Sequence, residues 1–415
     1  MRACPAHPDM EATPPASQTL QPAAGASRAP WLGFYAFVSI GINASIVGPA
    51  LPTFAAQTGA SLEQVGLLFT PFALGYATSV FIMTPIGARW GMRALLLSGA
   101  TCLLVSLALL LLAHSLPLIY LGAYLLGLGQ SGTQVGYNSM VGLLAGRNAA
   151  RMLNRLNAFF GIGALTGPLF VSLGYSLFGS SSVAVLLALA LSAPLWIGAW
   201  TWRDSVALPA GHNPANPAPA PLPLARLLRQ PVLWVLGATA SIYVSAEVAF
   251  SGWAAVYAER GSGVSAAQSA LLVTVFFAAF TLGRYVTDLI ARRVKPSVIV
   301  SVAIALTGLG LLKMLAAPGL FAIHVIGAAM VGVAMSPIYP ILLSYGVRLF
   351  PQSATLVTGF LTSVAAVATL IVPSVVGVVM AGQGSAAAWG LLLLIVVALA
   401  GGWALLRRML MRQLE

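Results

Sequence analysis

The chain has 415 residues, of which 59% are hydrophobic and only 7% are charged, and its formal net charge is +12. A soluble domain carries about a quarter charged residues, so this composition excludes a soluble globular protein and indicates one whose main solvent is lipid. The basic residues stand between apolar runs and form no patch, which argues against nucleic-acid binding.

Residues 1–30 are rich in Ala, Pro, Ser and Thr and lack the apolar core of a signal peptide. We interpret them as a disordered cytoplasmic tail. Beyond them, apolar runs long enough to cross about 30 Å of hydrocarbon recur along the chain. Twelve spans are predicted, near 31–55, 63–87, 94–113, 117–145, 156–178, 182–202, 231–257, 266–290, 297–315, 319–347, 354–381 and 386–406.

The positions of the basic residues support this number of spans. Lys and Arg collect in cytoplasmic loops of membrane proteins. With the N-terminus inside, 17 of the 20 Lys and Arg residues fall in tails or loops on the inner side. A missed or an extra helix would disturb this alternation, so both termini are predicted to be cytoplasmic.

The segment 203–230 is rich in Pro and Ala and separates two sets of six spans. It predicts a cytoplasmic linker between an N-terminal bundle (31–202) and a C-terminal bundle (231–409), with 410–415 as a short tail. A short basic loop follows the second span and another follows the eighth, so the halves look like repeats. The predicted fold class is an all-α membrane protein with twelve transmembrane helices in two pseudo-symmetric six-helix bundles.

Four of the predicted spans carry polar stripes, since side chains four residues apart share a helix face. Interhelical hydrogen bonding is an equally good interpretation for any single amide, whereas the whole stripe of the fourth span favours a cavity. The candidate substrate-binding residues are Asn43 on the first span, Gln130, Gln134 and Asn138 on the fourth, Tyr243 and Ser251 on the seventh, and Tyr339 on the tenth.

Glu247 lies near the middle of the seventh span, and no other acidic residue lies so deep in an apolar run. A carboxyl group at this depth is costly and usually faces a water-filled cavity or a partner. Glu247 is therefore the candidate proton-coupling residue. A fixed acceptor for a substrate and a structural partner for an arginine or a tyrosine are the open alternatives.

Arg284 and Asp288 are one helical turn apart near the end of the eighth span, a spacing that suits a structural ion pair. Arg284 gains importance if the substrate is an anion, because it is the only cation placed clearly inside a predicted span. Trp31 and Trp253 lie near span ends and are predicted to anchor the protein at the membrane interface. Stacking on a sugar ring is the alternative for Trp253.

The sequence has no Walker-type phosphate-binding loop and no His- or Cys-rich metal spacing. We therefore expect neither an enzyme nor a bound cofactor. Transport energy would come from an ion gradient, for which protons are the first candidate.

The segment 84–93 resembles the loop signature of the major facilitator superfamily, Gly-x-x-x-Asp-Arg-x-Gly-Arg-Arg. Arg89, Gly91 and Arg93 match it, whereas Thr84, Ala88 and Met92 replace the first Gly, the Asp and one Arg. The resemblance implies that this loop latches the two halves on the cytoplasmic side, which makes the three matching residues candidate gating residues. It also implies that the first, fourth, seventh and tenth spans line a central cavity.

Three shorter segments (159–168, 243–253 and 336–340) resemble the fucose/glucose–galactose branch of that superfamily, whose members are sugar–proton symporters. Asn43 and Gln130 or Gln134 stand in the regions where those symporters carry acidic residues. The Gly-x-x-x-Gly-Pro element at 163–168 also occurs in drug antiporters of the superfamily.

These features predict a secondary active transporter that moves a small solute, sugar-like or another polar metabolite, by proton-coupled alternating access. An efflux antiporter for lipophilic compounds and a non-transporting membrane sensor or scaffold are the alternatives. We expect a monomeric, multi-pass protein of a bacterial plasma membrane, in contact with a small-molecule substrate and lipid and with no nucleic acid. Symport, antiport and uniport all stay open.

Overall fold

The computed structural model describes residues 29–145, 149–202, 224–291, 293–350 and 353–414, and these residues form helices joined by turns. The helices of the first half are α1 (Ala29–Ile46), α2 (Leu51–Thr58), α3 (Leu62–Gly66), α4 (Phe69–Leu112), α5 (Leu116–Ala145), α6 (Ala149–Phe178) and α7 (Ser182–Thr201). Those that follow are α8 (Leu224–Leu227), α9 (Pro231–Ser262), α10 (Ala266–Ile290), α11 (Pro296–Ala316), α12 (Phe321–Met335), α13 (Ile338–Leu349), α14 (Ala354–Thr369), α15 (Val372–Gln383) and α16 (Ser385–Leu414).

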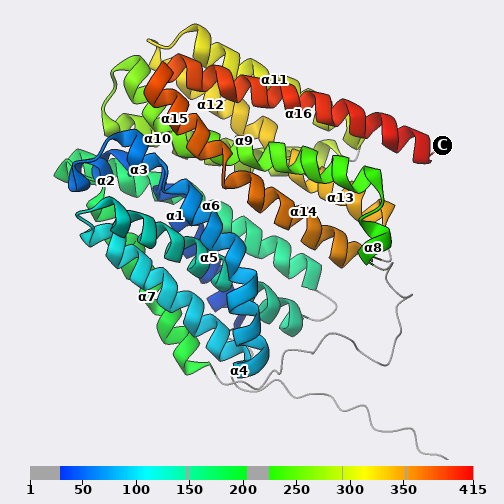
Figure 1. Ribbon diagram of the computed structural model, residues 1–415, viewed down its shortest axis with the longest axis horizontal. Coiled ribbons are helices and arrows are strands. Elements are labelled where there is room, and N and C mark those ends of the chain that lie inside the picture. Colours follow the sequence, from blue (N-terminus) through cyan, green and yellow to red (C-terminus); the bar gives the residue numbers. More distant parts are fainter. Residues whose placement is uncertain (1–28, 146–148, 203–223, 292, 351–352, 415) are drawn as a thin grey trace, which may run out of the picture.

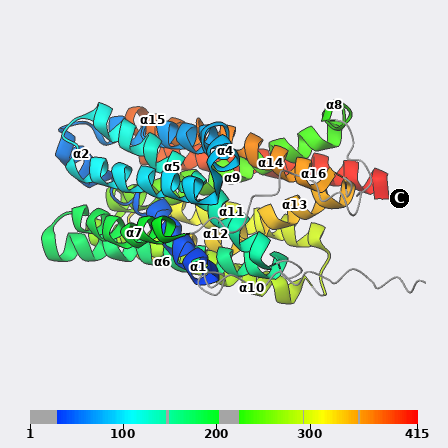
Figure 2. The same cartoon turned by 90° about the horizontal axis from the view of Figure 1, so that it is seen from below.

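The helices gather into two bundles, one of α1–α7 and one of α9–α16 (Figure 1). In both bundles the long helices run along the length of the molecule (Figure 2). The helices α2 and α3 lie at one end, and α8 and the C-terminal end of α16 lie at the other. We refer to these as the α2 end and the α8 end.

Most of the predicted spans correspond to helices suited to a membrane. Among the described residues, ten helices are long and apolar enough to cross one, or up to eleven if the bent pair Trp31–Ile46 and Leu51–Thr58 forms one span. The predicted span 117–145 coincides with α5, which is not among them because amides and hydroxyls interrupt its apolar sequence. The described part of the protein is thus all-helical with many membrane-crossing helices, whereas the number twelve and the cytoplasmic termini stay predictions.

The predicted tail and linker fall largely outside the described residues, which exclude 1–28 and 203–223. Within the predicted linker, Leu224–Leu227 forms the short helix α8. Residues 410–414 of the predicted C-terminal tail continue the helix α16, which ends at Leu414. An unbroken apolar helix extends easily into polar residues when no glycine or proline stops it.

The helices α1 and α6 approach each other through glycines. A Cβ atom on Gly41 would lie 2.2 Å from the Phe160 carbonyl oxygen, and one on Gly163 would lie 2.0 Å from the Val38 carbonyl oxygen. Without a hydrophobic force between helices in lipid, such close backbone contact is a main source of helix association. The N-terminal bundle therefore depends on the absence of side chains at these two positions.

We expect Gly163→Val to destabilise the protein by about 1–3 kcal/mol or more, because the new side chain must force two backbones apart. The measurement is the thermal unfolding midpoint of the detergent-purified protein. Gly390→Val is the matched control, since Gly390 is also helical and a Cβ there meets no atom within 4 Å. Equal midpoints for the two variants would contradict this account of the α1–α6 contact.

Candidate functional site

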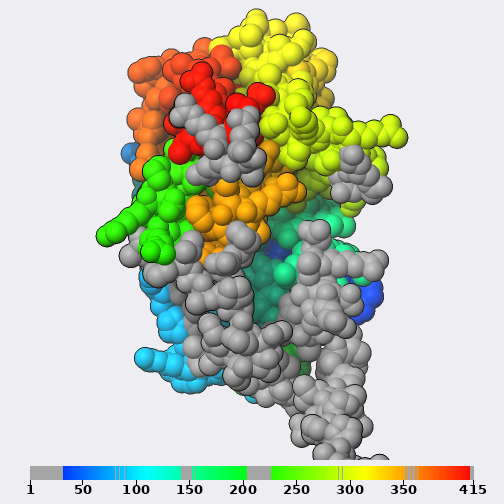
Figure 3. All heavy atoms as spheres, turned by 90° about the vertical axis from the view of Figure 1, so that its right-hand side faces the viewer, coloured from blue at the N-terminus to red at the C-terminus, as the bar shows by residue number. Residues whose placement is uncertain are grey.

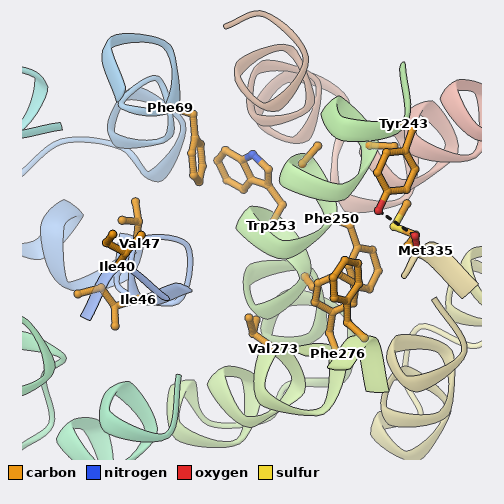
Figure 4. Close-up of a cluster of buried hydrophobic side chains, with 14 of the residues drawn as sticks. Ile40, Ile46, Val47, Phe69, Tyr243, Phe250, Trp253, Val273, Phe276 and Met335 are labelled. Carbon is orange, nitrogen blue, oxygen red and sulfur yellow. Dashed lines mark hydrogen bonds between the residues drawn. The ribbon is translucent and has the colours of Figure 1, made fainter. Parts of the chain in front are cut away.

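Glu247 lies on α9, one helical turn after Tyr243, where α9 faces the junction of α12 and α13. The ring of Tyr243 is 1% exposed and stacks on Tyr339 of α13, with 6.3 Å between the ring centroids. Its hydroxyl donates a hydrogen bond to the backbone carbonyl oxygen of Met335 at 2.8 Å (Figure 4). Tyr243, Glu247 and Tyr339 are thus brought together as the sequence predicts.

The carboxyl group of Glu247 is half-buried and interacts with the phenol of Tyr243. A phenol has a single hydrogen to donate, and here that hydrogen goes to the Met335 carbonyl. A hydrogen bond between Tyr243 and Glu247 then needs the carboxyl group as the donor. The phenolic oxygen can then accept a hydrogen bond from Glu247 only when that carboxyl group carries a proton.

Arg284 of α10 contributes a positive charge to the same region. It interacts electrostatically with both Glu247 and Tyr243, and its guanidinium group lies over the Phe280 ring at 4.8 Å from the centroid. Arg284 and Glu247 do not form a contact ion pair. The ion pair in direct contact within the described residues is Arg260–Glu63. The side chain of Asp288 lies outside the described part, so its predicted pairing with Arg284 is untested.

The N-terminal bundle adds Tyr76 of α4 and Gln134 of α5, whose side chains are half-buried. The Tyr76 hydroxyl donates a hydrogen bond to the Gln134 side-chain oxygen. Tyr76 also lies close enough to Tyr339 for an electrostatic interaction, so this pair faces the C-terminal bundle. Tyr76 is not among the residues predicted from the sequence, because its contact with Gln134 joins two helices and no motif marks it. We refer to Glu247, Tyr243, Arg284, Tyr339, Tyr76 and Gln134 as the central cluster.

The other polar candidates lie outside these contacts. Asn43 is fully buried, and its side-chain nitrogen donates to the Ser192 hydroxyl of α7 at 3.2 Å, so it packs inside the N-terminal bundle. Gln130 is 5% exposed, Asn138 is half-buried, and the Ser251 hydroxyl bonds the backbone of its own helix at Val248. Substrate binding by these four residues stays a prediction, and Asn43 is placed as a helix-packing amide would be.

The loop that resembles the family signature lies where the chain turns within α4. Gly91 has φ 86° and ψ 175°, a conformation that side chains disfavour, so a glycine is needed there. Arg89 is exposed, and the guanidinium of Arg93 lies over the Trp200 ring of α7 at 5.0 Å. This contact stays within the N-terminal bundle, and the predicted gating role of the three residues is not tested by it.

The two bundles are joined by polar contacts at the α2 end. The Thr70 hydroxyl lies 2.8 Å from the Leu370 carbonyl oxygen and 2.7 Å from the Ser374 hydroxyl. A guanidinium nitrogen of Arg260 lies 2.9 Å from a carboxylate oxygen of Glu63. Each contact pairs a residue of the N-terminal bundle with one of the C-terminal bundle.

Trp253 fills the space between the bundles at this end. A Cβ atom on Gly66 or on Gly377 would lie 2.3 or 2.4 Å from its ring, and its indole N–H donates to the Pro373 carbonyl at 2.8 Å. Phe69 of the N-terminal bundle lies beside the ring (Figure 4). Trp253 is fully buried, so the prediction that it anchors the protein at the membrane interface is wrong. Gly66 and Gly377 leave room for its ring inside the protein. Trp31, by contrast, is 71% exposed.

The opposite end is less closely packed. Figure 3 looks on to the α8 end and shows a hollow between the orange helices of the C-terminal bundle and the teal segments of the N-terminal bundle. Apart from Tyr243, which is buried, the residues of the central cluster keep accessible surface within apolar helices, as expected if this hollow reaches them. Within the described residues, no group of three or more His, Cys, Asp or Glu side chains could hold a metal ion.

A family model described as the Major Facilitator Superfamily matches residues 33–373. An uncharacterized MFS-type transporter of Yersinia pestis is 22% identical over 367 residues, which cover 88% of this chain and 92% of that protein. A TsgA homolog of Yersinia enterocolitica is 21% identical over 373 residues, with 87% and 90% covered.

Solved structures share the fold. The chain is similar to a mutant of the nucleoside transporter NupG, with TM-score 0.75, 13% identity and 91% and 99% of the two chains covered. It is also similar to a bacterial homolog of the human lysosomal transporter Spinster in an inward-facing, unoccupied conformation, with TM-score 0.72, 17% identity and 93% and 97% covered. At these identities the likeness concerns the fold alone.

Proposed function

The chain belongs to the major facilitator superfamily, and from this we propose that it is a secondary active transporter that moves a small polar solute by alternating access, coupled to protons through Glu247. The observation that carries the proposal is the central cluster. It places the deepest acidic residue of the chain beside hydrogen-bonding groups of both bundles.

The solute is inferred to be polar from the side chains that face it. Phenol, amide, carboxyl and guanidinium groups offer hydrogen bonds and charge, which are the means of recognising a polar molecule in a pocket. A site for lipophilic compounds would need few such groups. The central cluster therefore favours a polar solute over the efflux of lipophilic compounds.

The structure corresponds to one state of the transport cycle. The bundles meet through Trp253, Thr70 and Glu63 at the α2 end, and the hollow opens at the α8 end. If the α8 end is cytoplasmic, as the positions of the basic residues indicate, this is an inward-open state. Rocking of the bundles about the central cluster would then open the α2 end.

The test is uptake into liposomes that contain the purified full chain. Labelled sugars, nucleosides and carboxylates are each offered with and without a pH gradient, and protein-free liposomes give the background. We expect one solute class to accumulate, and to accumulate more when a pH gradient is imposed. Uptake of no polar solute above background, or uptake of lipophilic dyes alone, would overturn the proposal.

A further inference from the structure

We propose that the transported solute is an organic monocarboxylate, whose carboxylate group binds Arg284 while one proton is carried on Glu247. This inference rests on the proposed function and names its substrate class. It follows from the position of Arg284, from its separation from Glu247, and from the side chains around the two groups.

Arg284 faces the interior of the protein. The exposed apolar residues of α10 nearby are Leu282, Tyr285, Val286 and Leu289, which mark one side of the helix as its lipid-facing side. At 3.6 residues per turn, position 284 lies on the opposite side. Thr281, on the edge next to Arg284, contacts Gly161 of the N-terminal bundle, with 3.0 Å between its hydroxyl oxygen and a Cβ built on that glycine.

Arg284 is nevertheless exposed. Because its side of α10 faces away from lipid, this surface must open towards the space between the bundles. The Phe280 ring beneath the guanidinium is 7% exposed and covers one face of that planar group. The N–H groups at its edge match the two oxygens of a carboxylate.

A cation at bilayer depth needs a partner, since charged side chains there pair with one another or with a ligand. Among the described residues, Glu247 is the charged group that interacts with Arg284, and the two are not in contact. Because the Tyr243 hydrogen goes to the Met335 carbonyl, Glu247 can hydrogen-bond that phenol only when its own carboxyl group is protonated. A bound carboxylate supplies the negative charge that a protonated Glu247 does not.

The rest of the site suits an organic body with a single charge. The Tyr339 and Tyr76 side chains are half-buried, so each keeps part of its aromatic surface accessible to the organic body of a solute. One guanidinium balances one negative charge, so a monocarboxylate fits better than a doubly charged phosphate ester. The loaded site then holds a protonated Glu247 and a neutralised Arg284.

The first test compares matched solutes in the liposomes described above. The pairs are lactate with lactamide, gluconate with glucitol, and mandelate with mandelamide, and glycerol phosphate represents a phosphate ester. We expect uptake above the protein-free background of at least one carboxylate and of none of the neutral counterparts. Transport of neutral members alone, of the phosphate ester alone, or of no carboxylate would overturn the inference.

The second test measures charge movement and needs no variant. Entry of a monocarboxylate with one proton moves no net charge, so a potassium diffusion potential set with valinomycin should leave the accumulation ratio unchanged. A neutral solute with one proton would accumulate more when the interior is negative. Proton-driven uptake that responds to the potential would therefore contradict a monocarboxylate substrate, and it would still agree with the proposed proton-coupled transporter.

The third test replaces the arginine. Arg284→Gln should weaken carboxylate binding about 30-fold or more, measured by thermal stabilisation, since removal of one partner of a desolvated charge pair has effects of this size. Arg284→Lys should recover part of the binding. Arg408→Gln, which removes an exposed arginine of α16, is the control. Unchanged carboxylate binding in Arg284→Gln would contradict the proposed role of Arg284. If that variant does not fold, the charge-movement measurement on the wild type tests the substrate class instead.

Discussion

Replacing Glu247 with Gln is expected to abolish accumulation driven by a pH gradient and to leave exchange of preloaded solute intact. Gln has nearly the shape of a protonated Glu and can donate a hydrogen bond to the Tyr243 oxygen, but it cannot release a proton. With one proton carried per solute, the wild type should accumulate solute about tenfold per pH unit. The variant should reach only the external concentration.

Glu259→Gln is the matched control for this experiment. Glu259 lies on the same helix, is half-buried, and interacts with Arg260 near the α2 end, away from the central cluster. We expect this variant to keep its accumulation. Proton-driven accumulation that persists in Glu247→Gln would remove Glu247 from the coupling mechanism. Loss of both accumulation and exchange would assign it a binding or structural role instead.

A disulfide between cysteines at positions 70 and 374 should stop transport completely and reversibly. The Thr70 and Ser374 hydroxyl oxygens are 2.7 Å apart across the two bundles, so cysteine sulfurs at the same positions can bond with little backbone movement. The bond would hold the α2 end closed. We expect uptake to disappear on oxidation of Thr70→Cys/Ser374→Cys and to return on addition of dithiothreitol.

The chain offers a matched control pair within one bundle. The hydroxyls of Ser39 on α1 and Ser192 on α7 are 2.9 Å apart, and both helices belong to the N-terminal bundle. A disulfide in Ser39→Cys/Ser192→Cys should leave transport running, because the two helices move together. The natural cysteines, Cys4 and Cys102, are replaced by Ala beforehand. Full transport through an oxidised 70–374 disulfide would show that the bundles do not separate at the α2 end.

The helices, and the position of Glu247 within one of them, could be predicted from the sequence because both depend on local composition. Apolar runs of membrane length identify spans regardless of their neighbours, and a lone carboxyl such as Glu247 is conspicuous within one. The pairing of Tyr243 with Glu247 followed from helix periodicity, since the two are four residues apart. These inferences needed no knowledge of which helices touch.

The remainder of the site depends on contacts between distant segments. Asn43 and Gln134 look alike in sequence, yet Asn43 bonds Ser192 inside its own bundle whereas Gln134 accepts a hydrogen bond from Tyr76 near the other bundle. In sequence Trp253 resembles an interfacial tryptophan, whereas in the structure its ring packs against Gly66 and Gly377. Helix rotation and packing decide these cases, and a single sequence does not encode them locally.

The bond from Tyr243 to the Met335 carbonyl has a mechanical consequence. Met335 ends α12, and Pro337 separates it from α13, so the acceptor oxygen lies at a break between two helices. An ionised Glu247 would compete with that oxygen for the single phenolic hydrogen. Loss of the proton from Glu247 would then break the hydrogen bond between α9 and the break at Met335. The protonation state of one carboxyl group would thereby set how freely α12 and α13 move relative to α9.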